Sequence, residues 1–402
     1  MHILLIHQAF ASLDEPGGTR HFEMSQHLSE AGHKVTVIAS PISYLTGSTK
    51  INKRQEFRDD GNFTVLRTYT YKALHKSFIH RLFSFFSFMF SSFWVGLKVK
   101  NVDLVWGTSP PIFQGLTVWA LARLKGAKFV FEVRDLWPDF AVAMGVLNNK
   151  TIIRLSEWLE RFLYRRADQI IVNSPGFTEH IKRISSKPID LIPNGADAGM
   201  FDPNSRGIDF RELYKLQDKF MVLYTGAHGM ANDLGVVLKA AALLKGQEQI
   251  KIVLVGDGKE KRNLVRQAKE LDLNNLIFVS PVIKSNIAEV IAAADLCLAT
   301  LQPIEMYKTV YPNKVFDYMA AGRATLLGID GVIREVIESS SSGFFVQPGD
   351  PQALAEQIKK LASMPELLEQ MGKNGRAYLL KHFDRPVTAA QLQDLFKKTI
   401  KN

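Results

Sequence analysis

Short apolar runs alternate along the chain with longer amphipathic stretches. Residues 2–7 form the first apolar run, which is followed by a glycine-containing loop, an amphipathic stretch to about Ala31 and a second run, KVTVIAS. A strand, a helix and a second strand in this order form a βαβ unit, whose two strands lie parallel in one sheet. The beginning of the chain therefore predicts an α/β protein with a parallel sheet.

The alternation continues in two series. In the first, the expected strands are VDLVWGT, KFVFEV, DQIIVNS and PIDLIP, with a helix over residues 151–166. In the second, the expected strands are FMVLYTG, IKIVLVG, LIFVS and ADLCLAT, separated by helices at 233–245, 259–271 and 285–293. Two such halves predict two parallel sheets, with a ligand cleft between them as the expected active site.

The boundary between the two series is marked by composition. Prolines and charged residues are frequent from Asp202 to Asp218, which predicts a linker. We therefore expect one domain at 1–203 and a second at 204–375. Helices are expected to fill the rest of the chain, and residues 376–402 are expected to form a helix that packs back on the first domain.

One segment breaks the alternation, because residues 71–100 are rich in Phe and Ser and carry basic residues at both ends. The uncharged stretch between Arg81 and Lys98 is shorter than the roughly 20 apolar residues that a spanning helix needs. A helix of this kind is typical of the surface of an anionic membrane, where its basic residues lie near the headgroups. The alternative is a hydrophobic helix buried within the first domain.

Composition narrows the class of protein. The chain has 402 residues, 46% hydrophobic and 22% charged, which is typical of a folded globular protein of two or three domains. Its net charge of +10 favours an anionic partner. The single cysteine, Cys297, lies in an apolar run and excludes a disulfide framework. The first ten residues lack the basic start of a signal peptide, so we expect them to form the first strand.

The stretch MYKTVYPNKVFDYMAAGRATLLG, residues 306–328, carries the clearest candidate chemistry. Pro312 suits the first position of a helix, whose unpaired N–H groups and positive dipole end favour an anion. Lys314 adds a positive charge at this helix start, and Asp317 lies one turn further on, where it could accept hydrogen bonds from a ribose diol. The alternative is an ordinary capped helix with a solvated lysine and aspartate.

Two other places are candidates for ligand binding. Gly17-Gly18 precede the first helix and leave its backbone open to a ligand, with Arg20 in the first turn able to reach the same anion, although a plain turn explains the glycines equally well. Arg134, Asp135 and Asp139 follow the strand KFVFEV. In open parallel sheets this end of a strand borders the ligand crevice, and the alternative is ion pairing within the loop.

Some cofactors are disfavoured by the sequence. Gly256-Asp257-Gly258 closes a strand, but Lys261 stands where a dinucleotide fingerprint requires its third glycine, which argues against an NAD site. No Asp-x-Asp pair occurs, which weakens a magnesium-dependent reaction. We expect neither a metal nor an organic cofactor.

Several stretches together resemble the GT4 glycosyltransferases of the GT-B fold. They are IPNGAD at 192–197, LVGDGKEK at 254–261, AADLCL at 293–298 and FDYMAAG at 316–322. The stretches PGGTRHFEMSQHLSEAGHKVTV and EVRDLWP are similar to the subgroup that includes the O-antigen N-acetyl-L-fucosamine transferase WbuB. The match runs over nearly the entire chain, and no single motif is diagnostic. It implies an α/β protein of two Rossmann-like domains whose parallel sheets face each other across a cleft.

The resemblance also implies roles for particular residues. Asp317 is a shorter version of the glutamate with which the family binds the ribose hydroxyls. Thr309 stands where the family usually has a glutamate directed at the sugar. Asp135 falls near the family's His-Asp, where the acceptor hydroxyl is expected. Ala227 and Asn232 replace the family's phosphate-binding Arg and Lys, so Lys314, with His228 or Arg20, is expected to supply the charge. The expected donor-binding residues are Gly17, Gly18, Arg20, Gly226, His228, Gly256, Val282, Thr309, Tyr311, Pro312, Asn313, Lys314 and Asp317. Arg134 and Asp139 are expected on the acceptor side, and Asp135 and Lys314 are the expected catalytic residues.

The function that follows from the resemblance is a retaining, metal-independent glycosyltransferase. It is expected to move an acetamido sugar such as N-acetylfucosamine from a UDP donor to a polyprenyl-diphosphate-linked glycan, at the cytoplasmic face of the plasma membrane. A non-catalytic scaffold protein that binds nucleotide sugars is the alternative, favoured by Thr309, Ala227 and Asn232. Nucleic-acid binding is not expected, because the lysines are scattered rather than arranged in a stripe.

Overall fold

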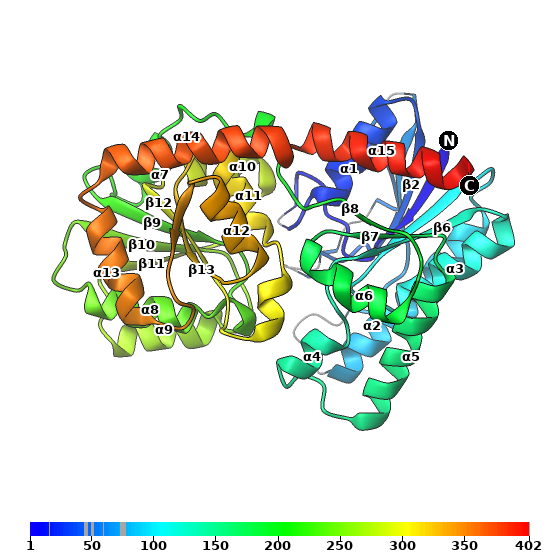
Figure 1. Cartoon of the computed structure of the whole chain (residues 1–402), viewed down its shortest axis with the longest axis horizontal. Helices are drawn as coiled ribbons and strands as arrows, with labels where there is room; N and C mark the ends of the chain where they lie inside the picture. The colour runs from blue at the N-terminus through cyan, green and yellow to red at the C-terminus, as the bar shows by residue number, and fades with distance from the viewer. Residues whose placement is uncertain (16, 44–46, 50–51, 59, 73–77, 402) are drawn as a thin grey trace. The chain divides into compact units, whose positions relative to one another are not determined.

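The protein divides into two compact units. A computed structural model describes residues 1–15, 17–43, 47–49, 52–58, 60–72 and 78–401 (Figure 1). Unit 1 consists of Met1–Pro193 and Pro386–Asn402, and unit 2 consists of Asn194–Arg385. The chain thus leaves unit 1 before the boundary at 203/204 that the sequence predicts, and its last residues return to unit 1.

Unit 1 is built on an eight-stranded sheet with the order β3-β4-β2-β1-β5-β6-β7-β8. All neighbouring strands are parallel except β3, which pairs antiparallel with β4. The apolar runs predict the other strands of this sheet, but they did not predict β3 and β4. The strands are β1 (His2–Ile6), β2 (Lys34–Ala39), β3 (Arg54–Glu56), β4 (Phe63–Arg67), β5 (Leu104–Thr108), β6 (Lys128–Val133), β7 (Gln169–Val172) and β8 (Ile189–Leu191).

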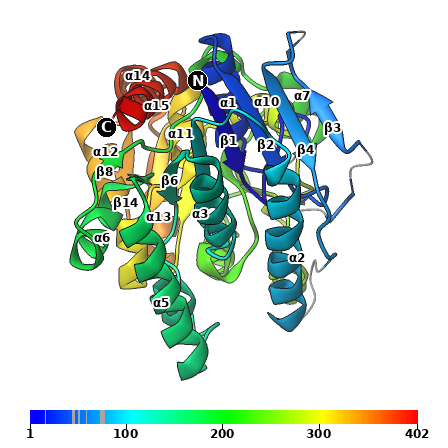
Figure 2. The ribbon, with the colours of Figure 1, turned by 90° about the vertical axis from the view of Figure 1, so that its right-hand side faces the viewer.

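Helices cover both faces of this sheet. On one face, α1 (Arg20–Glu30) and α15 (Arg385–Lys401) pack against the strands through a shared core that includes Phe22, Trp106 and Phe396. On the other, α3 (Gln114–Lys125) lies against β5 and β6, with α2 (Phe78–Leu97) and α5 (Lys150–Arg166) beside it (Figure 2). The remaining helices of unit 1 are α4 (Asp139–Ala143), α6 (Thr178–Ile184) and the 3₁₀ turn η1 (Pro175–Phe177).

Helix α2 occupies most of the Phe- and Ser-rich segment, of which residues 73–77 lie outside the described part. One face packs on α3, where Thr117 Oγ1 donates to Met89 O at 2.8 Å and Gly96 lies against Leu121. The opposite face is exposed, so the buried alternative describes one side of the helix, and the membrane surface stays a prediction for the other. Within the described ranges, no helix is both long and apolar enough to cross a membrane. The exposed stripe of α2 consists of Ile79, Phe83, Phe86, Phe90 and Trp94.

Unit 2 contains a fully parallel six-stranded sheet with the order β11-β10-β9-β12-β13-β14. Its strands are β9 (Phe220–Thr225), β10 (Ile250–Val255), β11 (Leu276–Val279), β12 (Leu296–Thr300), β13 (Thr325–Gly328) and β14 (Gly343–Phe345). Its helices are α7 (Ile208–Leu213), α8 (Leu234–Leu243), α9 (Lys261–Glu270), α10 (Lys284–Ala292), α11 (Asn313–Ala320), α12 (Val332–Ser339), α13 (Pro351–Leu361) and α14 (Pro365–His382), with 3₁₀ turns η2 (Ala198–Met200), η3 (Met230–Asn232) and η4 (Glu305–Thr309).

The predicted linker at Asp202 to Asp218 is wrong, because this stretch is part of unit 2. It contains α7, whose Phe210 is buried in the core and whose Arg211 pairs with Asp295 at 2.7 Å. The proline and charge content of the stretch suggested a flexible connection. Its charged side chains instead make specific contacts, which sequence composition alone does not reveal.

Candidate functional site

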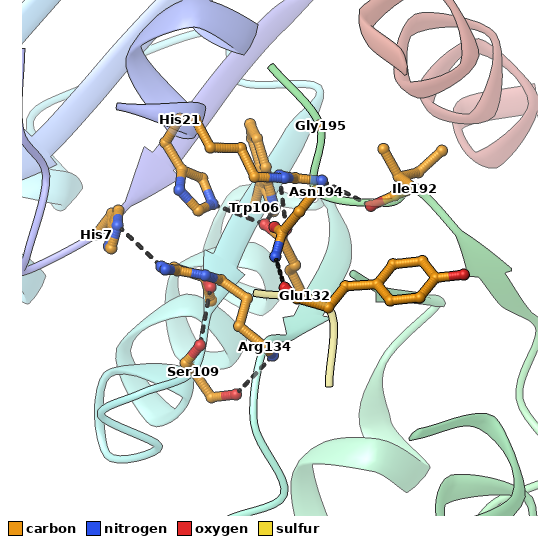
Figure 3. A network of polar contacts seen from close by, with 12 residues as sticks. His7, His21, Trp106, Ser109, Glu132, Arg134, Ile192, Asn194 and Gly195 are labelled. Atoms are coloured by element: carbon orange, nitrogen blue, oxygen red, sulfur yellow. Dashed lines mark hydrogen bonds and ion pairs between the residues drawn. The ribbon is translucent and has the colours of Figure 1, made fainter. Parts of the chain in front are cut away.

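A buried charged network lies inside unit 1, around Glu132 at the end of β6 (Figure 3). The Glu132 carboxylate is fully buried and pairs with Arg20 Nη1 at 2.7 Å. His21 Nε2 lies 2.7 Å from the other carboxylate oxygen, to which Trp106 Nε1 also donates at 3.1 Å. A carboxylate in this position is stable only because it has both a counter-ion and hydrogen-bond donors.

The charges of this network follow from burial and pairing. Burial alone would raise the pKa of Glu132, but Arg20 and His21 lower it to about 2, so Glu132 is ionised at neutral pH. Burial lowers the pKa of His21 to about 4 despite the nearby Glu132, so His21 is neutral and donates a hydrogen bond. Arg20 is therefore the counter-ion of Glu132.

This arrangement corrects the prediction that Arg20 meets a donor phosphate. The Arg20 side chain is only 4% exposed, and its Nη2 donates to Ile192 O at 2.8 Å in addition to the Glu132 pair. Because its charge is already neutralised inside unit 1, we reassign Arg20 from ligand binding to the positioning of Glu132. Gly17 and Gly18, just before α1, remain candidates; Gly17 has φ +147° and Gly18 is exposed.

Arg134 follows β6 at the carboxyl end of the sheet, as the sequence predicts. Its Nη1 donates to His7 Nε2 at 3.3 Å, and Figure 3 shows the two side chains pointing toward each other. Burial holds the pKa of His7 well below its usual range, so His7 is neutral and can accept. Among the described residues, no carboxylate lies within 4 Å of the Arg134 guanidinium. Arg134 is therefore a fixed cation at the strand end.

Asp135 lies beside Arg134 and has an unusual carboxyl group. Its Oδ1 is buried and makes no hydrogen bond to any described residue. Burial raises the pKa of Asp135 to about 6, although Arg134 opposes this shift. A carboxyl group that titrates near neutral pH at the end of a strand is a candidate acid or base.

Asp139 begins α4 and takes part in a second cluster. His180 Nδ1 lies 3.5 Å from Asp139, and His180 Nε2 lies 2.9 Å from Glu160 of α5. The hydrogen bond to Glu160 and the two carboxylate charges outweigh burial and raise the pKa of His180. Asp139 is half-exposed, so it can serve both this cluster and a ligand.

In unit 2, Lys314 is the central feature. Its Nζ lies 3.7 Å from the centroid of the Tyr224 ring and 3.4 Å from Asn232 Oδ1. Within the described part of the chain, no carboxylate lies within 4 Å of this ammonium. Burial lowers the pKa of Lys314 well below its usual range. An anion placed here would stabilise the charged form, because it would offset the lost hydration.

The surrounding backbone is shaped for close approach to Lys314. Gly226 and Gly256 have φ of +136° and +149°, which side chains other than glycine rarely adopt. A Cβ on Gly226 would lie 3.2 Å from Lys314 Nζ. Pro312 caps α11 with φ −69° and ψ 125°, so it lies one residue before the helix instead of at its predicted first position. The start of α11, with its exposed Asn313, still directs N–H groups toward this region.

His228 does not supply positive charge, which corrects the prediction. Its ring is fully buried between Tyr224 and Phe278, and burial lowers its pKa to about 4. Neither ring nitrogen has a hydrogen-bond partner among the described residues. His228 is therefore neutral, and Lys314, whose charged form a bound anion would stabilise, is the basic residue that remains from the predicted set.

Asp317 is held by a residue that the sequence analysis missed. Lys284 Nζ, from the start of α10, lies 2.7 Å from Asp317 Oδ1, and both side chains are largely buried. A lysine at a helix start gives little signal in a sequence, because most such lysines are solvated. The pair orients the Asp317 carboxylate in the second turn of α11.

The loop before α11 is anchored by backbone contacts. Thr309 Oγ1 donates to Met306 O at 2.6 Å, and Asn194 Nδ2 donates to Tyr311 O at 2.7 Å. The Tyr311 ring contacts Phe316 in the core. Val282, after β11, is half-buried. These contacts fix the loop that leads into Lys314.

Comparisons with known proteins agree with this architecture. Residues 17–195 match the family described as "Glycosyl transferase 4-like domain", and residues 205–378 match "Glycosyl transferases group 1". WcaI of Escherichia coli K12, named as a glycosyl transferase of colanic acid biosynthesis, is 24% identical over 359 residues, which cover 86% of this chain and 88% of WcaI.

Solved structures show the fold. Sucrose-phosphate synthase from Thermosynechococcus elongatus superimposes with a TM-score of 0.80 at 19% identity, over 99% of this chain and 98% of that one. HepE from Anabaena, solved in complex with UDP, has a TM-score of 0.72 at 16% identity, over 99% of this chain and 100% of that one. The predicted fold class, an α/β protein of two Rossmann-like domains with parallel sheets, is confirmed.

Proposed function

We propose a reaction for this chain, which is a glycosyltransferase of the group 1, GT4-like family: it transfers a sugar from a UDP-sugar to a lipid-linked glycan. The observation that carries this proposal is the half-buried side chain of Lys314, which has no carboxylate partner among the described residues and lies at the start of α11 with Gly226 beside its amine. The diphosphate of a nucleotide sugar is the ligand whose charge and size suit that position.

The chemistry requires stabilisation of the departing nucleotide. Cleavage of the bond between sugar and phosphate leaves negative charge on the diphosphate, which Lys314 and the N-terminal end of α11 would stabilise. We propose that this makes the reaction independent of a metal ion. Asp317, oriented by Lys284, would accept hydrogen bonds from the ribose hydroxyls.

The proposed reaction retains the configuration of the anomeric carbon. The donor phosphate accepts the proton of the acceptor hydroxyl on the same face of the sugar, so no protein nucleophile is needed. Asp135 orients that hydroxyl or assists the proton transfer. Arg134, fixed by His7, and Asp139 lie at the same end of the sheet and are proposed to bind the acceptor.

The role of Asp135 predicts a pH dependence. Because burial raises the pKa of this carboxyl group to about 6, its ionised fraction grows as the pH rises through 6. We expect kcat/KM to rise over this range and then level off, and the D135N variant to be slow with no inflection near pH 6. Rates measured from pH 5 to 8 test this, with thermal melts to exclude acid unfolding. A wild-type profile that is flat in this range would contradict the role.

The sugar and acceptor are proposed from likeness to other proteins. HepE was solved with UDP, and WcaI is named for polysaccharide synthesis, which supports a UDP donor and a polysaccharide intermediate as acceptor. The resemblance to the WbuB subgroup favours an acetamido sugar such as N-acetylfucosamine and a polyprenyl-diphosphate carrier, as in O-antigen assembly. A carrier of this kind would place the enzyme at the inner surface of the plasma membrane.

The exposed stripe of α2 supports a membrane surface as partner. A stripe of five large apolar side chains at helical spacing is unusual on a surface that faces only water. We expect F83S/F90S/W94S to bind anionic vesicles at least about tenfold more weakly, since each buried side chain contributes about 1.5–3 kcal/mol.

A matched control for this prediction lies in unit 2. I208S/L213S/L380S removes three exposed apolar side chains and should leave vesicle binding unchanged. Co-sedimentation with vesicles measures both variants. Equal loss in the two, or none in either, would exclude a specific role for α2.

A screen of donors tests the catalytic proposal. We expect UDP to bind more tightly than GDP or ADP, and a UDP-acetamido sugar to be consumed in the presence of a polyprenyl-diphosphate-linked glycan. The scaffold alternative is favoured by Thr309, Ala227 and Asn232, which stand where the resemblance implies side chains that contact the donor. UDP binding without turnover of any donor would support the scaffold and reject catalysis.

A further inference from the structure

Exposed aromatic side chains are confined to one region of unit 1. In the described ranges they are Tyr69, Phe83, Phe86, Phe90, Trp94 and Trp158, whereas unit 2 exposes none. Most lie on α2, and Tyr69 contacts α2 because its carbonyl accepts from Ser91 Oγ at 2.6 Å. Trp158 is different, because it lies on α5. The α2 stripe does not explain why α5 also exposes a tryptophan.

Helix α5 forms a shallow pocket around this tryptophan. The pocket has a volume of about 250 Å³ and is lined by Trp158, Arg161, Phe162, Arg165 and Arg166. The rings of Trp158 and Phe162 stack with centroids 5.5 Å apart at an angle of 21°. The Arg166 guanidinium lies 5.8 Å from the Phe162 centroid. One helix face thus combines an apolar floor with three cationic groups.

The arginines of this pocket have few carboxylate partners. Among the described residues, no carboxylate lies within 4 Å of Arg165 or Arg166, and Arg161 has only Glu157, at 3.8 Å. Arg165 donates one hydrogen bond, from Nε to Ile184 O at 3.3 Å. Most of the guanidinium donors are therefore open to an anion. Arginine binds phosphate oxygens in a bidentate manner, and tryptophan favours the interface between headgroups and acyl chains.

Helices α2 and α5 belong to one layer, because α3 joins them. Phe86 of α2 contacts Phe113, just before α3, with ring centroids 5.1 Å apart. Trp119 of α3 contacts Phe162 of α5 at 5.0 Å. In Figure 2 both α2 and α5 extend beyond the lower edge of the sheet. A bilayer that contacts the exposed stripe of α2 would therefore contact the same layer of helices in which α5 carries its pocket.

We propose that the α5 pocket binds the phosphate of an anionic phospholipid headgroup, with Trp158 at the level of the interface. This inference deepens the proposed action at a membrane surface and rests on it. The apolar side chains of the α2 stripe would insert into the bilayer. The arginines of α5 would make the protein prefer anionic over neutral lipid. The two helices together would fix the orientation of unit 1 on the bilayer, because two separated contacts prevent rotation about either one.

The test compares vesicles of phosphatidylcholine alone with vesicles that contain phosphatidylglycerol. We expect the full-length protein to bind the anionic vesicles more tightly, and R161Q/R165Q/R166Q to lose about 10²-fold of that affinity, since each basic residue near the surface contributes about one factor of five to ten. Binding of the variant to neutral vesicles, which depends on α2, should not change.

A control variant removes the same charge from another helix. R262Q/R266Q/K269Q alters exposed residues of α9 in unit 2 and should reduce anionic binding by less than a few-fold. Equal losses of affinity in both variants would show that only the net charge of the protein matters, which would contradict binding at the α5 pocket. Unchanged binding of R161Q/R165Q/R166Q to anionic vesicles would also contradict lipid binding at the α5 pocket. This face of α5 would then have another partner, such as a protein.

Two further measurements separate the alternatives. Titration with inorganic phosphate distinguishes a headgroup from a free anion, and arginine-dependent binding of phosphate with no effect on vesicles would overturn the lipid assignment. W158A should keep its melting temperature and bind anionic vesicles several-fold more weakly. Vesicle binding needs no sugar donor, so absence of sugar transfer with intact, arginine-dependent binding would reject the catalytic proposal alone.

Discussion

K314A is expected to lower kcat about 10²–10³-fold, which is the effect of removing one stabilising charge from a closed site. Lys314 lies at the start of α11 and has no carboxylate within 4 Å among the described residues, so its charged form, which a bound diphosphate favours, would stabilise the departing diphosphate. Tyr224 and Asn232 contact the ammonium without neutralising it. Steady-state rates with the best donor of the screen measure the loss.

Replacing Lys314 with an apolar side chain of similar length should not destabilise the protein. Burial holds the pKa of Lys314 well below its usual range, which means that the folded state disfavours the charged amine. K314M, which keeps the length of the side chain, should therefore melt at or above the wild-type temperature while losing activity. K239A, on the exposed side of α8, should leave both rate and melting temperature unchanged. A near-normal rate in K314A would show that the phosphates bind elsewhere.

E132A is expected to destabilise unit 1 by about 3–5 kcal/mol, because it leaves a buried charge without its partner. Arg20 would lose its counter-ion while keeping the hydrogen bond to Ile192 O, and His21 and Trp106 would lose their acceptor. Chemical denaturation measures the change in the free energy of unfolding. Removing both partners in R20M/E132Q should recover much of the loss, since an apolar replacement of a buried ion pair is often nearly neutral.

The pH dependence of this contribution has a defined sign. Because Arg20 and His21 lower the folded-state pKa of Glu132 to about 2, the ion pair stabilises the protein fully above the ordinary carboxyl range. This stabilisation is lost as the pH falls toward 2, and E132A should lack that component of acid denaturation. A change below about 1 kcal/mol in E132A would show that Arg20 is hydrated after all.

The alternating pattern was sufficient to predict most of the fold. Runs such as KFVFEV and IKIVLVG form strands β6 and β10, because apolar residues without interruption suit strands that are covered on both faces. Strand β3 was missed because it is a short polar strand (RQE) at the sheet edge, whereas β4, which lies between β3 and β2 and is largely buried, was missed despite its apolar residues. Helix α7 was missed because its charged residues suggested a linker, and its pairing with Asp295 depends on a residue far along the chain.

The residues of the candidate site were proposed from the sequence, and their binding roles stay predictions. The proline, lysine and aspartate of residues 312–317 were recognised because a helix start has a definite local pattern. The roles of Arg20 and His228 were mistaken, because burial and long-range partners decide whether a basic side chain is available to a ligand. Lys284 was missed for the same reason, since its contact with Asp317 arises only in the folded sheet.

In the proposed reaction, the loop and helix of residues 309–317 hold the diphosphate of a UDP-sugar. A crystal structure of the protein with UDP tests this most directly. We expect phosphate oxygens within hydrogen-bond distance of Lys314 Nζ and of backbone N–H groups at the start of α11, with the ribose hydroxyls on Asp317. A well-ordered UDP bound elsewhere, with both side chains unchanged and without contact to it, would contradict the claim.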